Sequence, residues 1–316
     1  MKLAILDDYQ NVALGLADWK SLEPDIETVS LHDVLADADA AARRLADFDI
    51  AIAMRERTPF PKALLERLPK LKLIVTAGMR NASIDVKAAS TRGITVCGTS
   101  MLATPTAELA WGLIIGLARS IPREHAGMRA GAWQTTVGIG LAGKVLGIVG
   151  LGKLGSQMAK IATAFGMEAI AWSPNLTPER ARAAGAAAVS KEELFKRADF
   201  VTVHVALNAG SRGIVGAGEL ALMKPTAYLV NTSRGPIVDT AALVAALKAR
   251  RIAGAAVDVY DQEPPAKDHP LRALDNVLLT PHLGYVTIEN YRDVYAQALE
   301  DVRAWRAGKP VRVIAP

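Results

Sequence analysis

The sequence predicts an α/β protein with two parallel sheets, each covered by helices on both faces. The first observation is that short apolar runs, typical of strands, alternate with helical patterns along most of the chain. The second is a glycine-rich turn that separates one such strand from its helix near the middle of the chain. A length of 316 residues, 51% of them hydrophobic, is enough for two domains with packed cores.

The first hundred residues have the pattern of a small α/β unit without a phosphate-binding loop of its own. The candidate strands are residues 2–5, 26–31, 49–54, 71–76 and 94–97, and helical patterns occur at residues 35–45, 62–68 and 84–91. Because strands and helices alternate, we expect the neighbouring strands to be parallel.

The glycine-rich turn follows an apolar strand pattern at residues 145–149 and matches G-x-G-x-x-G between Gly150 and Gly155. A helical run extends from Ser156 to Phe165 and is closed by Gly166, and residues 168–172 form another strand pattern. Glycine-rich turns also occur simply as turns. This order of strand, turn, helix and strand, however, is the one that a dinucleotide site requires.

Each glycine of the turn would have a distinct structural role in a dinucleotide site. Gly150 permits the tight turn, Gly152 lets the backbone approach a pyrophosphate, and Gly155 lets the helix pack against the strand. The N–H groups of the helix N-terminus, around Lys153 and Leu154, favour negative charge and would bind the phosphates. The sequence therefore predicts a bound dinucleotide.

The later elements define the domains. Strand patterns at residues 200–205, 228–231, 254–260 and 277–280 bring the number after residue 144 to six, the count of a doubly wound dinucleotide domain. An apolar helix that begins at Thr104 and Pro105 leads into that domain, and a terminal helix at residues 286–307 has no strand after it. We therefore predict a dinucleotide domain at residues 100–285 and a second domain made of residues 1–99 and 286–316.

Composition excludes several classes of protein. A single cysteine, Cys97, excludes a disulfide framework and a cysteine-based metal site and fits a reducing compartment such as the cytoplasm. Asp7 and Asp8 interrupt what would be the apolar part of a secretory signal, and residues 109–118 are too few to span a bilayer. The net charge of +5 comes from basic residues mixed with acids, so we expect neither a nucleic acid nor a membrane partner, and no metal.

Three polar segments follow predicted strands of the dinucleotide domain. Asn231 to Gly235 contains Arg234, residues 258–264 contain Asp258 and Glu263, and residues 280–284 contain His282. In isolation each has an ordinary explanation, such as a loop histidine that bonds a carbonyl or a solvated glutamate turn. Ligands in doubly wound sheets bind beyond the carboxyl ends of the strands, where all three segments fall. Together they indicate a catalytic site.

With the glycine-rich turn, these segments resemble the D-isomer-specific 2-hydroxyacid dehydrogenase family, which includes phosphoglycerate dehydrogenases and glyoxylate and hydroxypyruvate reductases. The resemblance covers nearly the whole chain, with further matches at residues 54–58, 78–85, 106–109 and 119–133. It implies a Rossmann cofactor domain inserted in a smaller, flavodoxin-like substrate domain. It also implies a homodimer formed through the cofactor domains, with residues 121–133 in the interface.

The chemistry of that family explains the three residue types. Hydride transfer to a 2-keto acid leaves negative charge on the former carbonyl oxygen, which must be protonated. His282 is the natural acid, since an imidazole ordinarily titrates near neutral pH. Glu263 would orient the imidazole and favour its protonated form, and Arg234 would bind the substrate's carboxylate and polarised carbonyl. The resemblance assigns these three positions the same roles.

The resemblance also implies binding residues. For the substrate they are Arg55, the backbone N–H groups around Gly78 and Met79, and the neighbouring Arg80. At the cofactor, Thr106 would contact the nicotinamide ring and Asp258 its carboxamide, with Thr232 and Gly284 nearby. His204 is either structural or close to the nucleotide.

Two positions depart from the family pattern. Ser173 stands where an acidic residue usually binds the adenine ribose, and its loss removes repulsion against a 2′-phosphate. Ser173 and Asn175 could bond that phosphate, and Arg180 or Arg182 could reach it, so the sequence favours NADP over NAD. Arg80 replaces a glycine that many relatives carry, and would bind either a second acidic group of the substrate or its own loop or Glu108.

The resulting hypothesis is an enzyme that reduces a small 2-keto acid to the D-hydroxy acid. One alternative is a biosynthetic phosphoglycerate dehydrogenase. The sequence ends at Pro316 without a regulatory domain, which makes this alternative the weaker expectation. The other is a nucleotide-sensing regulator similar to the C-terminal-binding corepressors, which use the same scaffold and can retain the histidine, glutamate and arginine. The fold alone does not decide between them.

Overall fold

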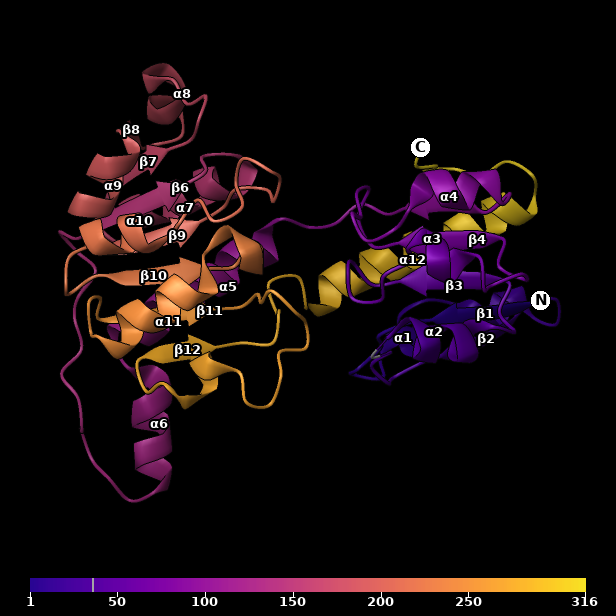
Figure 1. Ribbon diagram of the computed structural model, residues 1–316, viewed down its shortest axis with the longest axis horizontal. Helices are drawn as coiled ribbons and strands as arrows, with labels where there is room; N and C mark the ends of the chain where they lie inside the picture. Colours follow the sequence, from indigo (N-terminus) through magenta and orange to yellow (C-terminus); the bar gives the residue numbers. More distant parts are fainter. Residues whose placement is uncertain (36) are drawn as a thin grey trace. The chain divides into compact units, whose positions relative to one another are not determined.

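The computed structural model describes residues 1–35 and 37–316 of the chain. They divide into two units. Unit 1 consists of Met1–Leu102 and Thr287–Pro316, and unit 2 of Ala103–Val286. Figure 1 shows both units, coloured along the sequence.

Unit 1 is built on a parallel sheet. Its described residues form five strands, β1 (Lys2–Ile5), β2 (Glu27–Ser30), β3 (Ile50–Ala53), β4 (Leu73–Thr76) and β5 (Thr95–Gly98), in the order β2-β1-β3-β4-β5. The three central strands β1, β3 and β4 are almost entirely apolar and buried, as expected for parallel strands covered on both faces.

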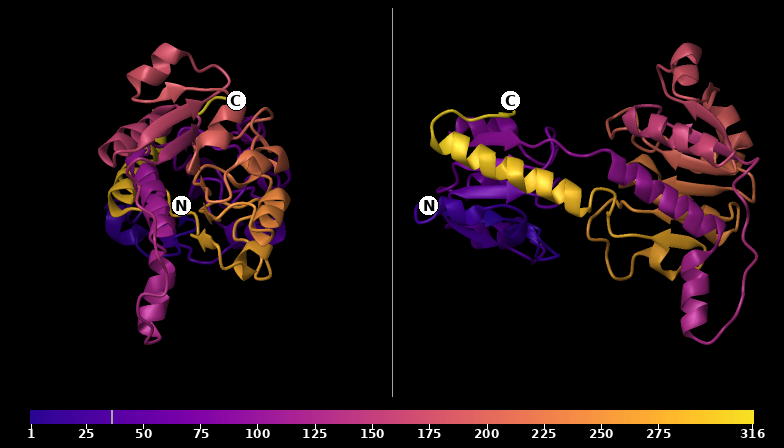
Figure 2. Two further views of the ribbon diagram at one scale, coloured as in Figure 1. Left: turned by 90° about the vertical axis from the view of Figure 1, so that its left-hand side faces the viewer. Right: turned by 180° about the vertical axis from the view of Figure 1, so that it is seen from behind.

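The helices of unit 1 follow the strands and cover the sheet. They are α1 (Ala13–Leu16), α2 (Ala38–Leu45), α3 (Lys62–Leu65), α4 (Val86–Thr91) and α12 (Ile288–Arg306), with a 3₁₀ turn at Trp19–Leu22. The helix predicted at residues 35–45 corresponds to α2, and residue 36 lies outside the described residues. The C-terminal helix α12 packs against β4 and α1, and Figure 2 shows it beside the sheet.

Unit 2 is built on a larger parallel sheet. All its residues are described, and they form seven strands, β6 (Val145–Val149), β7 (Glu168–Trp172), β8 (Ala187–Ala188), β9 (Phe200–Val203), β10 (Tyr228–Asn231), β11 (Gly254–Val257) and β12 (Val277–Leu279). Their order is β12-β11-β10-β9-β6-β7-β8. The predicted fold class, two doubly wound parallel sheets, is confirmed. The two-residue strand β8 was not predicted, because it is too short to show any periodicity.

The helices of unit 2 lie on both faces of this sheet, except α6, which projects away from it (Figure 1). They are α5 (Thr104–Ala118), α6 (Ile121–Arg129), α7 (Lys153–Ala164), α8 (Pro178–Ala183), α9 (Lys191–Arg197), α10 (Ala217–Leu222) and α11 (Thr240–Lys248), with 3₁₀ turns at Gly235–Ile237 and Pro270–Ala273. Helix α5 packs against α7, β10 and β11, which explains why it is apolar almost all round. Across the described residues, no helix is long and apolar enough to cross a membrane.

Each order reverses once along its sheet. In unit 1 the reversal lies between β1 and β3, and in unit 2 between β6 and β9. At such a point the loops beyond the carboxyl ends of adjacent strands diverge and leave a crevice for a ligand. The loops after β1 and β3 in unit 1 and those after β6 and β9 in unit 2 flank these points. The loops after β4, β10, β11 and β12 lie along the same carboxyl edge of their sheets.

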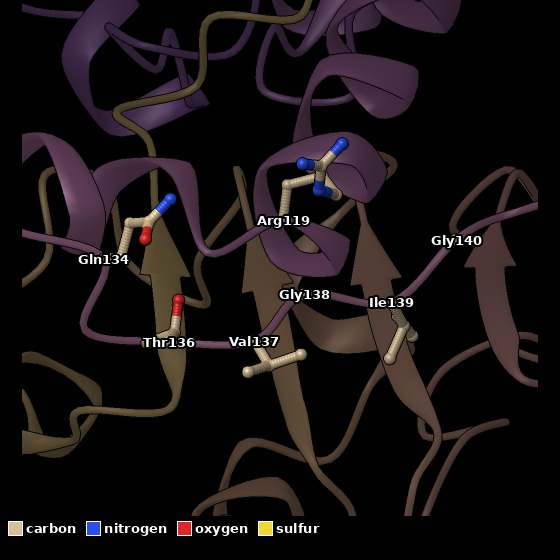
Figure 3. Close-up of a pocket in the computed structure, with 7 residues that line it drawn as sticks. All are labelled: Arg119, Gln134, Thr136, Val137, Gly138, Ile139 and Gly140. Carbon is tan, nitrogen blue, oxygen red and sulfur yellow. The ribbon is translucent and has the colours of Figure 1, made fainter.

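Residues 119–144 of unit 2 form an exposed segment between α5 and β6, which we call the arm. None of the residues of α6 is buried, and Trp133 and Val137 are 74% and 99% exposed. A hollow of about 560 Å³ is lined by Arg119, Gln134 and residues 136–140 (Figure 3). Because these residues lie on the exposed segment rather than on the strand-end loops, we treat the hollow as part of this arm.

Candidate functional site

The glycine-rich turn after β6 is shaped by close packing. Gly150 has a φ of +98°, and a Cβ there would lie 2.8 Å from the His204 carbonyl. A Cβ on Gly155 would lie only 2.1 Å from the Gly150 oxygen. Gly152, in contrast, has nothing within 4 Å of the position its Cβ would take. The turn is therefore tight on its inner side and open at Gly152.

Helix α7 begins directly at this turn, at Lys153 rather than at the predicted Ser156. The first hydrogen bond from the turn into the helix runs from the Ser156 N–H to the Gly152 oxygen. The N–H groups of Lys153 and Leu154 precede it and point out of the helix end, as in every helix. A helix start with glycines and free N–H groups fits a pyrophosphate.

The end of β7 carries the polar residues expected near an adenine ribose. The Ser173 hydroxyl accepts a hydrogen bond from the Leu151 N–H at 3.0 Å, so its own proton remains available. The Arg180 side chain donates from Nη1 to the Asn175 carbonyl at 3.1 Å. Sequence reasoning left Arg180 and Arg182 as alternatives, and the contact with Asn175 favours Arg180.

Two buried polar atoms lie at the ends of β9 and β10. His204 Nε2 is 2.8 Å from Thr202 Oγ1, while His204 Nδ1 and Thr232 Oγ1 have no hydrogen-bond partner among the described residues. Burial lowers the pKa of His204 to about 4, so the ring is neutral at pH 7. Buried polar atoms at the ligand edge of the sheet fit a bound nucleotide that would contact them.

The loop after β10 positions Arg234. Asn231 donates from Nδ2 to the Arg234 carbonyl and accepts from the Ser233 N–H, both at 3.1 Å. Arg234 Nη1 donates to the Ser233 carbonyl at 2.8 Å. A Cβ on the next residue, Gly235, would lie 2.1 Å from the Tyr260 carbonyl carbon, so only glycine lets this loop pack against the loop after β11.

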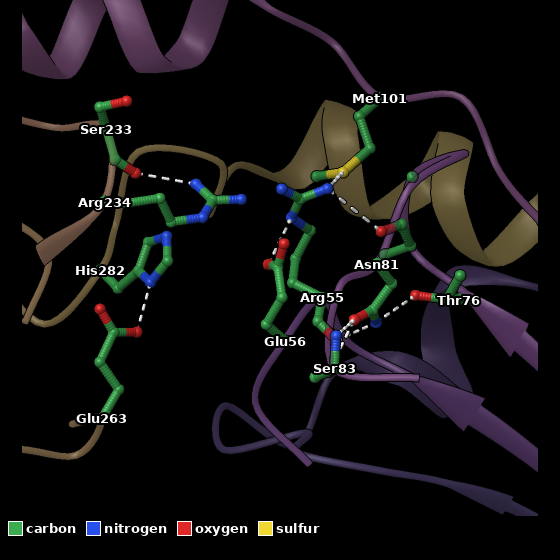
Figure 4. Close-up of polar contacts among 12 residues, drawn as sticks. Arg55, Glu56, Thr76, Asn81, Ser83, Met101, Ser233, Arg234, Glu263 and His282 are labelled. Carbon is green, nitrogen blue, oxygen red and sulfur yellow. Dashed lines mark hydrogen bonds and ion pairs between the residues drawn. The ribbon is translucent and has the colours of Figure 1, made fainter. Parts of the chain in front are cut away.

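Glu263 and His282 form a closely bonded pair. His282 Nδ1 lies 2.5 Å from Glu263 Oε2, and Glu263 Oε1 accepts the Tyr260 N–H at 2.9 Å. Figure 4 shows the second ring nitrogen of His282 on the side that faces Arg234. His282 has a φ of +54°, a left-handed backbone that a non-glycine residue rarely adopts and that is often found at functional sites.

Asp258, fully buried at the end of β11, organises the loop that carries His282. Its carboxylate accepts hydrogen bonds from Thr280 Oγ1 (2.6 Å), the Leu283 N–H (2.7 Å) and the Gly284 N–H (2.9 Å). Burial raises its pKa, which these three donors and the nearby His282 counteract. Thr106 Oγ1 donates to the Gly284 carbonyl at 2.8 Å and ties α5 to the same loop.

In unit 1 the predicted substrate residues follow the carboxyl ends of the adjacent strands β3 and β4. Arg55, with a φ of +55°, lies against Gly78: a Cβ on Gly78 would be 2.5 Å from Arg55 Nη1. Arg55 Nε is also 3.6 Å from Glu56. The Gly78 N–H donates to Thr99 Oγ1 at 3.2 Å, whereas Met79 is 44% exposed and Arg80 is also exposed.

Sequence reasoning missed several supporting residues. Neither the Tyr260 N–H that holds Glu263 nor the close contact of Gly235 has a sequence signal, because both depend on two loops meeting in space. Asn81, which bonds Arg55 and Thr76, was also missed, although its place in the Gly78 to Asp85 motif was a hint. The described residues contain no cluster of three or more His, Cys, Asp or Glu suited to a metal.

Comparison with known proteins gives the family. Residues 111–284 match the model of the D-isomer specific 2-hydroxyacid dehydrogenase, NAD binding domain. The chain belongs to this family. Unit 2 is thus an NAD-binding domain, and the residues described above at its strand ends lie within or beside the matched segment.

The similar proteins include glyoxylate reductases and D-3-phosphoglycerate dehydrogenases. A glyoxylate reductase of Thermococcus litoralis is 43% identical over 238 residues, which are 72% of each chain. A D-3-phosphoglycerate dehydrogenase of Archaeoglobus fulgidus is 35% identical over 99% of this chain and 58% of its own length. A similar enzyme of Methanocaldococcus jannaschii is 42% identical over 78% of this chain and 47% of its own length. The chain thus spans only about half the length of these phosphoglycerate dehydrogenases.

Solved structures agree with the fold. A phosphoglycerate oxidoreductase from Vibrio cholerae superposes with a TM-score of 0.93 at 38% identity, over 98% of this chain and 99% of the other. An acyclic imino acid reductase in complex with NADPH and D-Arg superposes with a TM-score of 0.76 at 28% identity, over the whole of both chains.

Proposed function

We propose that the protein is an NAD(P)-dependent oxidoreductase that transfers a hydride between nicotinamide and C2 of a small 2-keto or D-2-hydroxy acid. The single observation that carries the proposal is the Glu263–His282 pair, 2.5 Å apart, in the family's NAD-binding domain. A histidine held by a carboxylate at the ligand edge of a doubly wound sheet has the geometry of a general acid–base.

The proposed chemistry needs one proton and one hydride. The nicotinamide, when bound, supplies the hydride that forms the new bond at C2 of the keto acid. As the carbonyl π electrons move to oxygen, protonated His282 donates its Nε2 proton there and becomes neutral. In the reverse direction neutral His282 accepts the hydroxyl proton. Glu263 orients the ring through Nδ1.

Each unit carries groups suited to an anionic substrate. The Arg234 guanidinium suits the carboxylate and the developing negative charge on oxygen, because its planar fork donates two parallel hydrogen bonds. In unit 1, the backbone N–H groups at Met79, with Arg55 in the same unit, suit a carboxylate. The Gly78 N–H already has an acceptor in Thr99, so Met79 is the better candidate.

The cofactor would occupy the edge of the unit 2 sheet. Its pyrophosphate would bind at Gly150, Gly152 and Gly155 and at the first N–H groups of α7. Its nicotinamide would lie against Thr106, Asp258 and Gly284, with His204 and Thr232 along the same edge. The open position at Gly152 and the buried atoms His204 Nδ1 and Thr232 Oγ1 support this assignment.

We also propose NADP as the preferred cofactor. A 2′-phosphate would meet the Ser173 hydroxyl and the Arg180 guanidinium, with no carboxylate at residue 173 to repel it. The contact of Arg180 with Asn175 supports this choice, because it holds a cation beside the end of β7. NAD remains the alternative, since Ser173 can equally donate to a ribose hydroxyl.

We propose a homodimer formed through the arm at residues 119–144. Ile121, Met128, Trp133 and Val137 are 50%, 60%, 74% and 99% exposed, an unusually apolar surface for a segment in water. Glu124 accepts hydrogen bonds from Thr135 and Thr136, which lower its pKa to about 2 and hold the two halves of the arm together. The arm is thus an ordered surface that a second copy would cover.

The test is nicotinamide absorbance with NADPH and NADH in parallel, against glyoxylate, hydroxypyruvate, phenylpyruvate and 2-ketoglutarate. We expect turnover of at least one keto acid, and a fall of about 10²- to 10⁴-fold in kcat for His282→Ala. The variant should bind the cofactor with unchanged affinity. Nucleotide binding without turnover of any 2-keto acid would contradict the proposal and favour a nucleotide-sensing regulator.

A further inference from the structure

The loop after β4 carries a cation that the proposed reaction does not use. Arg80 is exposed, and its side chain makes no hydrogen bond or ion pair with the described residues of unit 1. The two other arginines at this edge differ. Arg55 pairs with Glu56, and Arg57 donates to the Asp7 carbonyl at 3.2 Å and lies 4.8 Å from the centre of the Tyr9 ring.

The backbone on which Arg80 stands is firmly held. The neighbouring Asn81 donates from Nδ2 to the Arg55 carbonyl (2.6 Å) and to Thr76 Oγ1 (2.8 Å). Its Oδ1 accepts from the N–H (3.0 Å) and the hydroxyl (2.6 Å) of Ser83. Figure 4 shows these contacts around Asn81. The four bonds fix the loop, so that the Arg80 side chain projects from a defined position.

The same loop presents backbone donors. Within the described chain, the N–H groups of Met79 and Arg80 have no acceptor, while the preceding N–H of Gly78 bonds Thr99. Successive N–H groups that point outward from a tight turn attract an anion. The loop therefore offers two distinct donor sets: the N–H groups of Met79 and Arg80, and the guanidinium of Arg80.

We infer that the substrate carries two anionic groups. This inference rests on the proposed function. The 2-keto carboxylate binds the N–H groups of residues 79 and 80, and a second carboxylate or a phosphate farther along the substrate binds the Arg80 guanidinium. The guanidinium fork matches the oxygens of either group. Arg80 thereby determines specificity for dianionic over monoanionic keto acids.

The experiment compares matched substrates with the full-length protein. One pair is 2-ketoglutarate and 2-ketovalerate, which have five carbons each and differ in the second carboxylate. The other pair is phosphohydroxypyruvate and hydroxypyruvate, which differ in the phosphate. The pair with the larger ratio of kcat/KM, dianion over monoanion, identifies whether the second group is a carboxylate or a phosphate.

Arg80→Ala should lower that ratio about 10- to 100-fold, mainly through KM, as expected when one charge-assisted contact is lost. Arg80→Lys, which keeps the charge without the fork, should restore part of it. Arg92→Ala is the matched control. Arg92 is an exposed arginine at the C-cap of α4, before the start of β5 and away from the carboxyl ends of the strands. It should leave the ratio unchanged.

An unchanged ratio in Arg80→Ala, with turnover intact, would overturn the inference and leave the proposed function standing. If no keto acid is turned over at all, calorimetric titration of the protein–NADPH complex with the same four compounds replaces the kinetics. Tighter binding of a dianion that Arg80→Ala abolishes would still support the inference while the proposed function fails. Equal affinity for both members of each pair would overturn it.

Discussion

Asp258 holds the loop of His282 from both sides. Its carboxylate accepts the hydroxyl of Thr280, two residues before the histidine, and the N–H groups of Leu283 and Gly284, which follow it. His282 thus lies between residues that all donate hydrogen bonds to one buried carboxylate. This contact explains how the chain maintains a left-handed φ of +54° at His282.

Asp258→Ala should therefore damage both stability and activity. It leaves one buried and two partly buried donors without their acceptor, which we expect to lower the free energy of unfolding of unit 2 by about 3 kcal/mol. Thr280→Val removes one donor and keeps the carboxylate, so a loss of about 1 kcal/mol is expected for this control. Urea unfolding of both variants gives the comparison. Equal losses of unfolding free energy in the two variants would show that Asp258 does not act through these three hydrogen bonds together.

Gly235→Ala should separate the Arg234 loop from the Glu263 loop. The new methyl group would overlap the backbone of Tyr260, whose N–H holds Glu263. We expect destabilisation of about 1–3 kcal/mol and a fall in kcat of at least 10-fold. Gly218→Ala is the matched control, since Gly218 lies in α10 with nothing within 4 Å of a Cβ. That change should be neutral or stabilising by up to about 1 kcal/mol.

The sequence predicted the fold class and where the polar segments meet, because period, glycine spacing and strand order are local properties. The 2.5 Å approach of Glu263 to His282 follows from strand ends that meet at one edge of the sheet. The role of Asp258 as the acceptor for its neighbouring loop was not predictable. It depends on how residues 280–284 fold back, which no periodic pattern encodes.

In unit 1, too, the sequence did not predict contacts that depend on how loops fold. The motif at residues 78–85 indicated a substrate loop, but it did not reveal that the Gly78 N–H is taken by Thr99. Arg80 could be assigned to its own loop or to the substrate from the sequence alone. The side-chain contacts of Asn81, which leave Arg80 outside the hydrogen-bonded core of the loop, came only from the structure.

Cofactor choice should respond to Ser173. Ser173→Asp places a carboxylate next to the expected 2′-phosphate, so we expect the ratio of kcat/KM for NADPH over NADH to fall about 10- to 100-fold. Arg180→Ala should raise KM for NADPH a few-fold without changing KM for NADH. Arg182→Ala, two residues away on α8, is its control. A wild-type preference for NADH that neither change alters would rule out the NADP proposal.

Assembly should depend on the arm. Trp133→Asp puts a charge into the apolar surface that we expect a second copy to bury, and should weaken dimerisation at least 100-fold. Light scattering after size-exclusion chromatography measures the mass directly. Leu14→Asp alters another exposed apolar residue, in unit 1, and should leave the mass unchanged. A wild-type protein that is monomeric at micromolar concentration would contradict the proposal.

Stability should fall in acid because of His204. Its folded-state pKa of about 4 lies below the ordinary histidine value of 6.5, because burial disfavours the charged ring. Below pH 6.5 the unfolded chain therefore binds a proton that the folded chain does not, so the contribution is complete above pH 6.5 and is lost as the pH falls towards 4. In that window the free energy of unfolding should decline by up to about 1.4 kcal/mol per pH unit from this group alone. His204→Gln should make the slope shallower by that amount, whereas His125→Gln, in the exposed arm, controls for the loss of a histidine. An identical slope in wild type and His204→Gln would mean that the ring takes up its proton in the folded protein as readily as in the unfolded chain.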